Sequence, residues 1–226
     1  MEGVNWGKRY AIINDLSPAA TFISYNYNIR KAVLSFIEDA EYAISKCREE
    51  YAWMFETQHT TNGVVHKGID GNPIIGTINY IVWSDVFVCP NCSKEIIFWE
   101  VALDDKSGKV RNIFKCHYCG SDLSKRDCTR KQETYFDTEL SRVVTVAKQV
   151  PVLINYSVGN RRYEKVPDSF DLGIIRKINE SKIPFYVPTD ELPDGFNTEQ
   201  PKRSHGLNYV HQFYTKRNLF VISCFF

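Results

Sequence analysis

The sequence predicts a mixed α+β fold in which helical segments flank a β-rich middle region. Apolar residues recur at spacings of three and four between residues 29 and 57, which is typical of an amphipathic helix. From about residue 59 to 166, β-branched and aromatic residues form short runs separated by turn residues. Two Cys-x-x-Cys pairs interrupt that region, which indicates a metal-stabilised insertion.

The N-terminal part reads as a strand that leads directly into a helix. Lys8–Ile13 is a short apolar run typical of a buried strand. A turn follows, in which Ser17 fits the N-cap position and Pro18 the first helical position. The long helix predicted at about 29–57 comes next, with a charged face toward solvent.

The middle region is predicted to be β-structure with tight turns. Turns are expected at Asp70–Pro73 and at Gly159–Asn160. Strands are predicted at Gly63–Val65, Thr77–Val88, Gln132–Phe136, Arg142–Val146, Val150–Ser157 and Arg162–Val166.

Four cysteines, Cys89, Cys92, Cys116 and Cys119, form the two pairs, with 23 residues between the pairs. Two residues between thiolates allow a tight turn to direct both sulfurs at one ion, so the two turns complete a tetrahedral zinc shell. Such a shell has no open position, which indicates structural zinc. Two alternatives stay open, namely a disulfide in the Cys-x-x-Cys pairs and His117 as a ligand in place of a cysteine.

A zinc ribbon is expected over about residues 85–125. Glu95–Leu103 is strand-like, Asp104–Gly108 is a turn, and Val110–Phe114 returns to the second pair. The predicted order is therefore knuckle, hairpin, knuckle.

The C-terminal part returns to helices. Asp168 or Ser169 caps a helix that stops before Pro184, and Thr215 caps a short helix ending near Cys224. Between them, residues 184–206 are rich in Pro and Gly and are predicted to form an irregular loop. Both ends of the chain look like elements whose neighbours are missing.

Composition indicates a soluble protein. The chain has 226 residues, 43% hydrophobic and 24% charged, with no stretch suited to a membrane span or a signal peptide. Cys47, Cys128 and Cys224 are isolated, which favours a reducing, cytoplasmic location. The net charge is +1, yet residues 106–131 hold eight Lys or Arg against two Asp. That local excess of +6 has three interpretations: it binds nucleic acid, it balances the negative charge of a zinc–thiolate centre, or it only forms a solvated face.

Several segments together resemble a family of zinc-ribbon-containing DNA methyltransferases. These enzymes use S-adenosylmethionine to methylate the exocyclic amino group of cytosine (N4) or adenine (N6). The resemblance covers nearly the whole chain and is carried by Asn14–Ile23, Trp53–Thr57, Ile78–Phe87 with the Cys-Pro-Asn-Cys that follows, Lys148–Tyr156 and His211–Leu219.

The resemblance implies an incomplete Rossmann-like α/β methyltransferase fold. Residues 1–58 would be part of the methyltransferase core, 59–166 the inserted target-recognition region with the zinc ribbon, and 167–226 the return to the core. The family's glycine-rich cofactor loop would precede Tyr10, and its Pro-Pro-aromatic catalytic motif would follow the last helix. The chain has neither, so we expect no catalytic residue and no methyl transfer by the chain alone. The missing N- and C-terminal parts are expected partners.

The resemblance also implies one cofactor-binding residue. Asp15 would stand at the end of the second core strand and accept hydrogen bonds from the ribose hydroxyls of S-adenosylmethionine, as acidic residues do in other nucleotide-binding α/β folds. The alternative is that Asp15 only supports the N-terminus of the following helix electrostatically.

DNA is the partner that the resemblance implies. The basic residues expected to contact phosphates are Lys125, Arg126, Arg130, Lys131, Arg161 and Arg162. Trp83, Trp99 and Tyr118 are candidates to stack on bases, or belong to the core. A second class of function stays open, a stand-alone zinc-ribbon module that binds nucleic acid or protein without catalysis.

Overall fold

The computed structural model describes residues 12–28, 33–104 and 108–225. The chain divides into two compact units, Met1–Lys46 and Cys47–Phe226. The strand predicted at Lys8–Ile13 falls mostly outside the described residues. The three predicted regions, 1–58, 59–166 and 167–226, stay predictions.

The first unit contains α1 (Pro18–Asn28) and most of α2 (Val33–Tyr51). Helix α1 begins at the predicted residue, because the Ala20 N–H donates to Oγ of Ser17 at 3.4 Å. The helix predicted at about 29–57 is wrong beyond Tyr51, and residues 29–32 are outside the described part. A 3-10 turn, η1 (Ala52–Phe55), and strand β1 (Glu56–Gln58) replace its last turns. Pairing of β1 with another strand outweighs the helical periodicity of this stretch.

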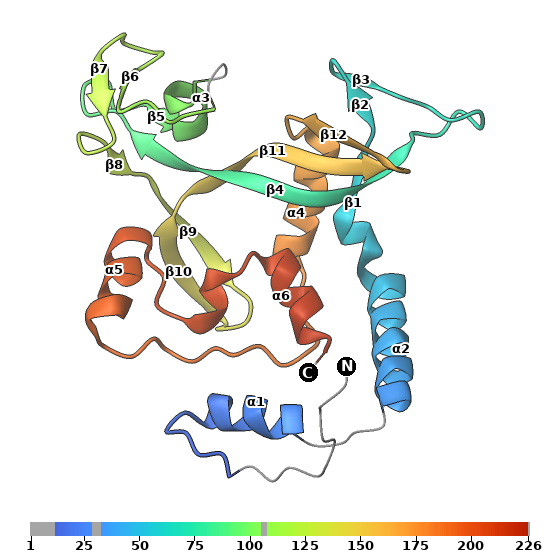
Figure 1. Ribbon diagram of the computed structural model, residues 1–226. Helices are drawn as coiled ribbons and strands as arrows, with labels where there is room; N and C mark the ends of the chain where they lie inside the picture. Colours follow the sequence, from blue (N-terminus) through green and yellow to red (C-terminus); the bar gives the residue numbers. More distant parts are fainter. Residues whose placement is uncertain (1–11, 29–32, 105–107, 226) are drawn as a thin grey trace, which may run out of the picture. The chain divides into compact units, whose positions relative to one another are not determined.

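The second unit is organised around two long antiparallel strands, β4 (Ile75–Val88) and β11 (Gln149–Val158), shown crossing the unit in Figure 1. Strand β1 borders β4, and β12 (Arg161–Lys165) borders β11, in the order β1-β4-β11-β12. Two further strands, β5 (Glu95–Ile97) and β8 (Thr129–Arg130), pair with the C-terminal end of β4. Every strand pair among the described residues is antiparallel. The observed class is therefore α+β.

Three two-stranded ladders complete the β-structure: β2 (Thr60–Thr61) with β3 (Val64–Val65), β6 (Ile113–Lys115) with β7 (Asp122–Ser124), and β9 (Gln132–Asp137) with β10 (Arg142–Ala147). The strands predicted after the second cysteine pair are thus confirmed. The predicted turn between β11 and β12 is confirmed as well, with Gly159 in the left-handed region at φ 57°.

The predicted hairpin between the cysteine pairs is formed only in part. Glu95–Ile97 of the predicted strand is extended, α3 (Phe98–Ala102) replaces its middle, and an antiparallel bridge joins Leu103 to Val110. Strand β5 pairs with β4, whereas β6 pairs with β7. Each cysteine pair therefore lies at the tip of its own hairpin. Aromatic and β-branched residues suggested a strand at 98–102, but burial of Ala102 and packing of Phe98 stabilise a helical turn there.

The C-terminal helices are α4 (Ser169–Glu180), α5 (Phe196–His205) and α6 (Lys216–Ser223), with a 3-10 turn η2 (Val210–Phe213) before α6. Asp168 caps α4 in a reciprocal capping box with Asp171, and Thr215 caps α6, as predicted. The prediction of an irregular loop over 184–206 is wrong in its second half. Helix α5 is short and contains Pro201, which concealed it in the sequence.

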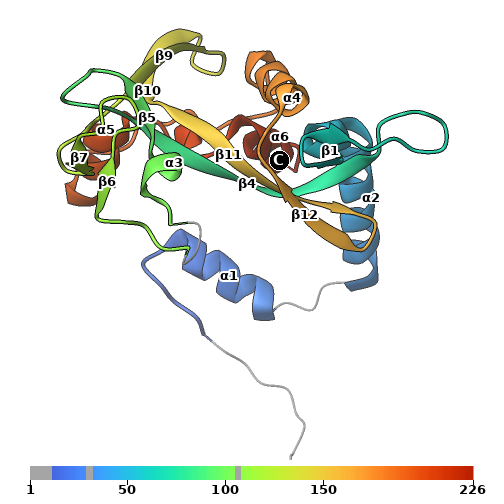
Figure 2. The same cartoon turned by 90° about the horizontal axis from the view of Figure 1, so that it is seen from above.

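The main core of the second unit lies between η1, α4 and α6. Its buried members are Met54, Ile178, Ile183, Val187, Leu219 and Phe220. Figures 1 and 2 both show α4 beside the β1 end of the sheet. A separate buried cluster surrounds the four paired cysteines, at the other end of β4. The cysteine region thus has its own apolar centre.

Candidate metal centre

Two hairpin tips with the same backbone geometry position the four cysteines. In the first tip, the Ser93 N–H donates to the Cys89 carbonyl at 2.9 Å, and the Cys89 N–H donates to the Lys94 carbonyl at 3.0 Å. The second tip repeats both bonds at the same spacing. The Gly120 N–H donates to the Cys116 carbonyl at 2.8 Å, and the Cys116 N–H donates to the Ser121 carbonyl at 2.9 Å.

The turn residue after each pair is left-handed. Ser93 has φ 57° and Gly120 has φ 75°, and both follow the second cysteine of their pair. This conformation closes the turn and brings the two sulfurs of each pair to one side. The chain therefore builds the same knuckle twice, once from β4 and β5 and once from β6 and β7.

The four sulfurs form one cluster. All Sγ atoms lie within 4.8 Å of one another. The distances from Cys89 to Cys119 and from Cys92 to Cys116 are both 3.8 Å. Zinc–sulfur bonds of about 2.3 Å in a tetrahedron require sulfurs about 3.8 Å apart. The cluster could hold a metal ion and is compatible with structural zinc.

The structure favours neither alternative for this site, the disulfide or His117 as a ligand. None of the four cysteines forms a disulfide. His117 is exposed, and its ring packs against Tyr118 at 4.2 Å between centroids. The clustered ligand atoms among the described residues all belong to cysteines. The geometry thus favours a four-sulfur shell.

Buried apolar side chains pack around the cluster. Cys89 and Cys116 are buried, as are Ile96, Phe114 and Leu123. Cys119 is exposed and lies 3.3 Å from Oγ of Ser121. Hydrogen bonds from the Ser121 side chain and backbone lower the pKa of the Cys119 thiol to about 6. A lowered pKa favours the thiolate, the form that binds metal.

The predicted DNA-contact residues form two separate groups. Lys125, Arg126, Arg130 and Lys131 lie near the end of β4 that leads into the first knuckle, where Arg130 is opposite Phe87. Arg161 and Arg162 begin β12, whose partner β11 pairs Ser157 with Thr77 at the other end of β4. Ten residues of strand separate Thr77 from Phe87, which is about 33 Å. A single group of six is therefore not formed.

The first group is tied to two carboxylates that sequence analysis missed. Asp85 receives a hydrogen bond from Arg130 at 3.2 Å and one from Gln149 at 3.0 Å. Although burial acts to raise it, these bonds and the Arg130 charge hold the pKa of Asp85 below its ordinary value. Glu95 binds Lys148 at 2.7 Å and Lys131 at 3.3 Å. The sequence does mark both residues: Asp85 is the single acidic residue of an apolar strand, and Glu95 lies just after the first cysteine pair.

Asp15 is exposed and lies just before α1. One carboxylate oxygen accepts the backbone N–H of Ser17 at 2.7 Å. This contact matches the alternative interpretation, in which Asp15 supports the start of the helix. An ionised carboxylate has about four acceptor positions, so the contact is compatible with binding of ribose hydroxyls as well.

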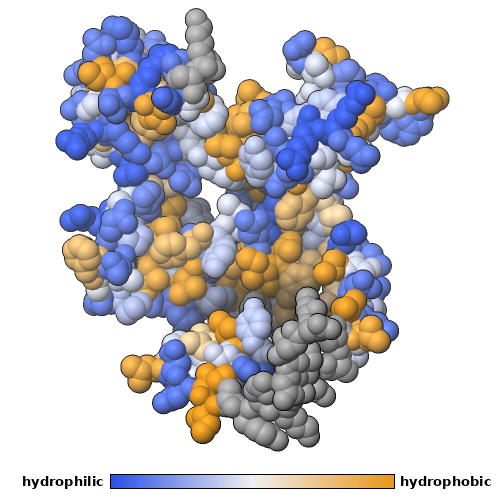
Figure 3. Space-filling view, in the orientation of Figure 1, coloured by the Kyte–Doolittle hydropathy of each residue, from blue (hydrophilic) through white to orange (hydrophobic). Residues whose placement is uncertain are grey.

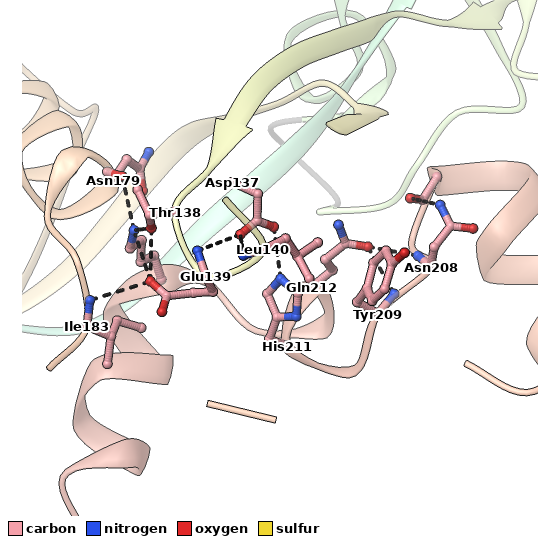
Figure 4. A network of polar contacts seen from close by, with 12 residues as sticks. Asp137, Thr138, Glu139, Leu140, Asn179, Ile183, Asn208, Tyr209, His211 and Gln212 are labelled. Carbon is pink, nitrogen blue, oxygen red and sulfur yellow. Dashed lines mark hydrogen bonds and ion pairs between the residues drawn. The ribbon is translucent and has the colours of Figure 1, made fainter. Parts of the chain in front are cut away.

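The segment His211–Leu219 contributes a polar network to the second unit (Figure 4). His211 Nε2 lies 2.9 Å from Oδ2 of Asp137, and both side chains are buried. The other Asp137 oxygen accepts the N–H groups of Glu139 and Leu140 at 3.0 and 3.1 Å. Lys216 donates to Thr138 and lies 3.6 Å from Glu139. These residues therefore fix the turn between β9 and β10 against η2 and α6.

No helix in the described part of the chain has the length and apolar character of a membrane span. Comparison of the sequence with protein-family models and with curated proteins finds no match, and comparison of the structure with solved structures finds none either.

Proposed function

We propose that this chain is a segment of a DNA methyltransferase that transfers a methyl group from S-adenosylmethionine to an exocyclic amino group of a DNA base. In this proposal, the segment supplies part of the cofactor pocket and the zinc-bearing target-recognition region. The observation that carries it is the four-cysteine cluster. The cluster connects two hairpin tips at the C-terminal end of the long strand β4, near the basic residues Lys125, Arg126, Arg130 and Lys131. The methyl-transfer chemistry rests on the resemblance of the sequence segments.

Zinc has a structural role in this proposal. Cys89, Cys92, Cys116 and Cys119 would hold it, and their closed shell leaves no position for substrate or water. The ion would fix the two hairpin tips and so the direction of the basic residues nearby. Lys125 and Arg126 are exposed and suited to phosphate contacts, which position DNA without reading its sequence.

The first unit would supply the cofactor half. Helix α1 has no buried residue, and large apolar side chains on α1 and α2 are exposed, including Phe22 at 68% and Phe36 at 67%. Apolar surface is visible over α1 in Figure 3. Such helices are stabilised by burying an apolar face, so we propose that they pack against further parts of a methyltransferase core. Asp15 would then face the ribose of S-adenosylmethionine.

The test combines metal analysis, DNA binding and methyl transfer on the purified chain. We expect one zinc ion per chain, binding of duplex DNA that weakens steeply with salt, and no robust transfer of a labelled methyl group. Each phosphate contact contributes about one unit to the slope of log affinity against log salt. Robust turnover by this chain would contradict the expectation that the chain alone transfers no methyl group.

Charge-matched variants make the DNA test specific. The double variant Lys125→Ala/Arg126→Ala removes two exposed charges beside the knuckles, and we expect the salt slope to fall by about two. The control, Arg176→Ala/Lys182→Ala, removes two exposed charges on and just after α4. It should leave the slope unchanged. Equal effects of both variants would refute a DNA surface at the knuckles.

A stand-alone binding module is the second candidate. It is favoured by the separate apolar cluster around the cysteines, which gives this region its own core. Calorimetry with S-adenosylmethionine discriminates between the two functions. Cofactor binding that is lost in Asp15→Ala favours the methyltransferase segment. DNA binding with a steep salt slope and without cofactor binding points to a DNA-contacting fragment.

A further inference from the structure

A pocket of about 220 Å³ opens between β4 and α3, close to the metal centre. Its walls are mainly aromatic and apolar, and its lining residues are Trp83, Ser84, Asp85, Phe98, Trp99, Leu103 and Val110. The volume is below the roughly 300–1,000 Å³ of pockets for drug-sized ligands. It suits a single small ring system. Figure 1 shows α3 above the end of β4 where the pocket lies.

The pocket walls are held in place by the fold. The Trp99 N–H donates to Oγ of Ser84 at 2.9 Å, which fixes the start of α3 to β4. Phe98 packs edge-on against Phe87 at 5.5 Å and against Phe114 at 5.6 Å. These contacts connect α3 to the buried cluster of the metal centre. The pocket is therefore largely preformed, and its shape depends on the knuckles.

Asp85 is the one charged residue in the pocket lining, and it pairs with two cations, Arg130 at 3.2 Å and Lys125 at 4.0 Å. This group of three has one positive charge in excess. Lys125 Nζ also lies 4.8 Å from the centroid of Phe98. A cationic ligand is disfavoured by this arrangement, whereas a flat ring attached to an anionic group is complementary to it.

We propose that this pocket receives one unstacked base of a DNA strand, with the adjoining phosphate next to Lys125 and Arg130. The inference rests on the proposed DNA-binding function and adds to it a site for a single base. The indole of Trp99 supplies the stacking face, and the side chain of Gln149, which binds Asp85, adds polar character nearby. The pocket reads the presence of an unpaired base rather than the sequence of a duplex.

The test uses a DNA duplex with one bulged thymine and the same duplex with a bulged abasic residue. Stacking on an aromatic side chain is worth about 1–3 kcal/mol per base, so we expect about tenfold tighter binding of the base-containing duplex by the wild-type chain. Trp99→Ala should lose this preference and keep its affinity for the abasic duplex and its salt slope. Tyr186→Ala, at an aromatic residue that is 69% exposed and does not line the pocket, is the control and should keep the preference.

A second measurement serves in case Trp99→Ala does not fold. Stacking of a base on an indole quenches its fluorescence, so the bulged thymine should quench the wild-type emission more than the abasic residue does. Equal affinity and equal quenching for both duplexes would overturn the base site while leaving DNA binding intact. That result would favour an apolar side chain of a protein partner as the occupant. Absence of binding to either duplex would overturn the proposed function together with the base site.

Discussion

At the scale of single residues, buried polar groups hold the connections between elements. Lys165 is 6% exposed at its side chain and binds Asp168 at 2.7 Å and Asp171 at 2.8 Å. Asp171 also accepts the hydroxyl of Thr57 at 2.6 Å, across 114 residues of sequence. Buried charges cost free energy unless they are paired, so each partner depends on the others. Sequence patterns identify helices and strands but cannot identify such pairings, because the partners lie far apart in the chain.

The pair formed by Asp137 and His211 gives the first residue-scale prediction. Asp137→Asn keeps the side-chain shape but removes the negative charge that accepts the His211 hydrogen bond. Hydrogen bonds to charged groups are worth about 1.5–3 kcal/mol, so we expect the free energy of unfolding to fall by about 2 kcal/mol at pH 7. Urea denaturation followed by tryptophan fluorescence measures this change.

The same pair predicts the pH dependence of stability. Burial acts to raise the pKa of Asp137, but hydrogen bonds from His211 and the backbone outweigh it and hold the pKa below its ordinary value. A lowered folded pKa stabilises the fold above the unfolded pKa, near 4, and the stabilisation is lost as the pH falls through the folded pKa. The difference between wild type and Asp137→Asn should therefore shrink as the pH falls below about 4. Glu180→Gln, at an exposed carboxylate at the end of α4, should leave stability unchanged, and a difference that grows below about pH 4 would contradict the assignment.

At the scale of elements, local signals predicted most of the structure. The starts of α1, α4 and α6 follow from Ser17, Asp168 and Thr215, because capping chemistry acts within a few residues. The β-strands after the second cysteine pair follow from runs of β-branched and aromatic residues. The pairing of β5 with β4 was not predictable, since nothing in the local sequence distinguishes it from pairing with β6.

In the candidate site, too, local features could be predicted from the sequence and long-range contacts could not. The spacing of the four cysteines was enough to predict the metal cluster, because each knuckle is a local turn. The basic residues were predicted from charge alone, and the sequence could not show that Arg130 is engaged by Asp85. The aromatic pocket escaped prediction as a pocket, because it requires α3 where a strand was expected. Tertiary packing decides these features.

Helix α5 ends at Gly206, which gives the element-scale prediction. Gly206 has φ 72°, and a Cβ there would lie 2.6 Å from the Thr145 carbonyl oxygen and 3.1 Å from Cα of Val146. Gly206→Ala therefore combines left-handed strain of about 1–2 kcal/mol with an overlap against β10 that costs about 1–3 kcal/mol. We expect a loss of about 3 kcal/mol in the free energy of unfolding, measured by urea denaturation.

A matched glycine separates strain from overlap. Gly71 has φ 78°, and a Cβ there would meet no atom within 4 Å. Gly71→Ala should cost only the strain, about 1 kcal/mol. If both variants lose the same stability, the close approach of α5 to β10 is incorrect.

At the scale of the whole molecule, strand β4 connects the metal centre to the buried sheet cluster of Ile78, Ile154 and Tyr156. The N-terminal part of β4 pairs with β11, and its last residues, Val86–Val88, pair with β5. The apolar cluster around the cysteines is distinct from the cluster between η1, α4 and α6. Loss of the metal should therefore unfold one region without the other.

Removal of zinc by a chelator tests this division, with hydrogen exchange read by mass spectrometry. Binding of structural zinc contributes on the order of 10–16 kcal/mol to folding. Without the ion, the small apolar cluster that includes Ile96, Phe114 and Leu123 is not enough to keep this region folded. We expect amides within about 85–125 to lose protection first, whereas those of β11, α4 and α6 keep it. Cys116→Ser should reproduce the chelated pattern without chelator, and Cys128→Ser, next to the cluster but outside the four, should not. Simultaneous loss of protection throughout the second unit would show that the metal supports the whole unit, and the proposed role of zinc as a local brace for a DNA-contacting surface would fail with it.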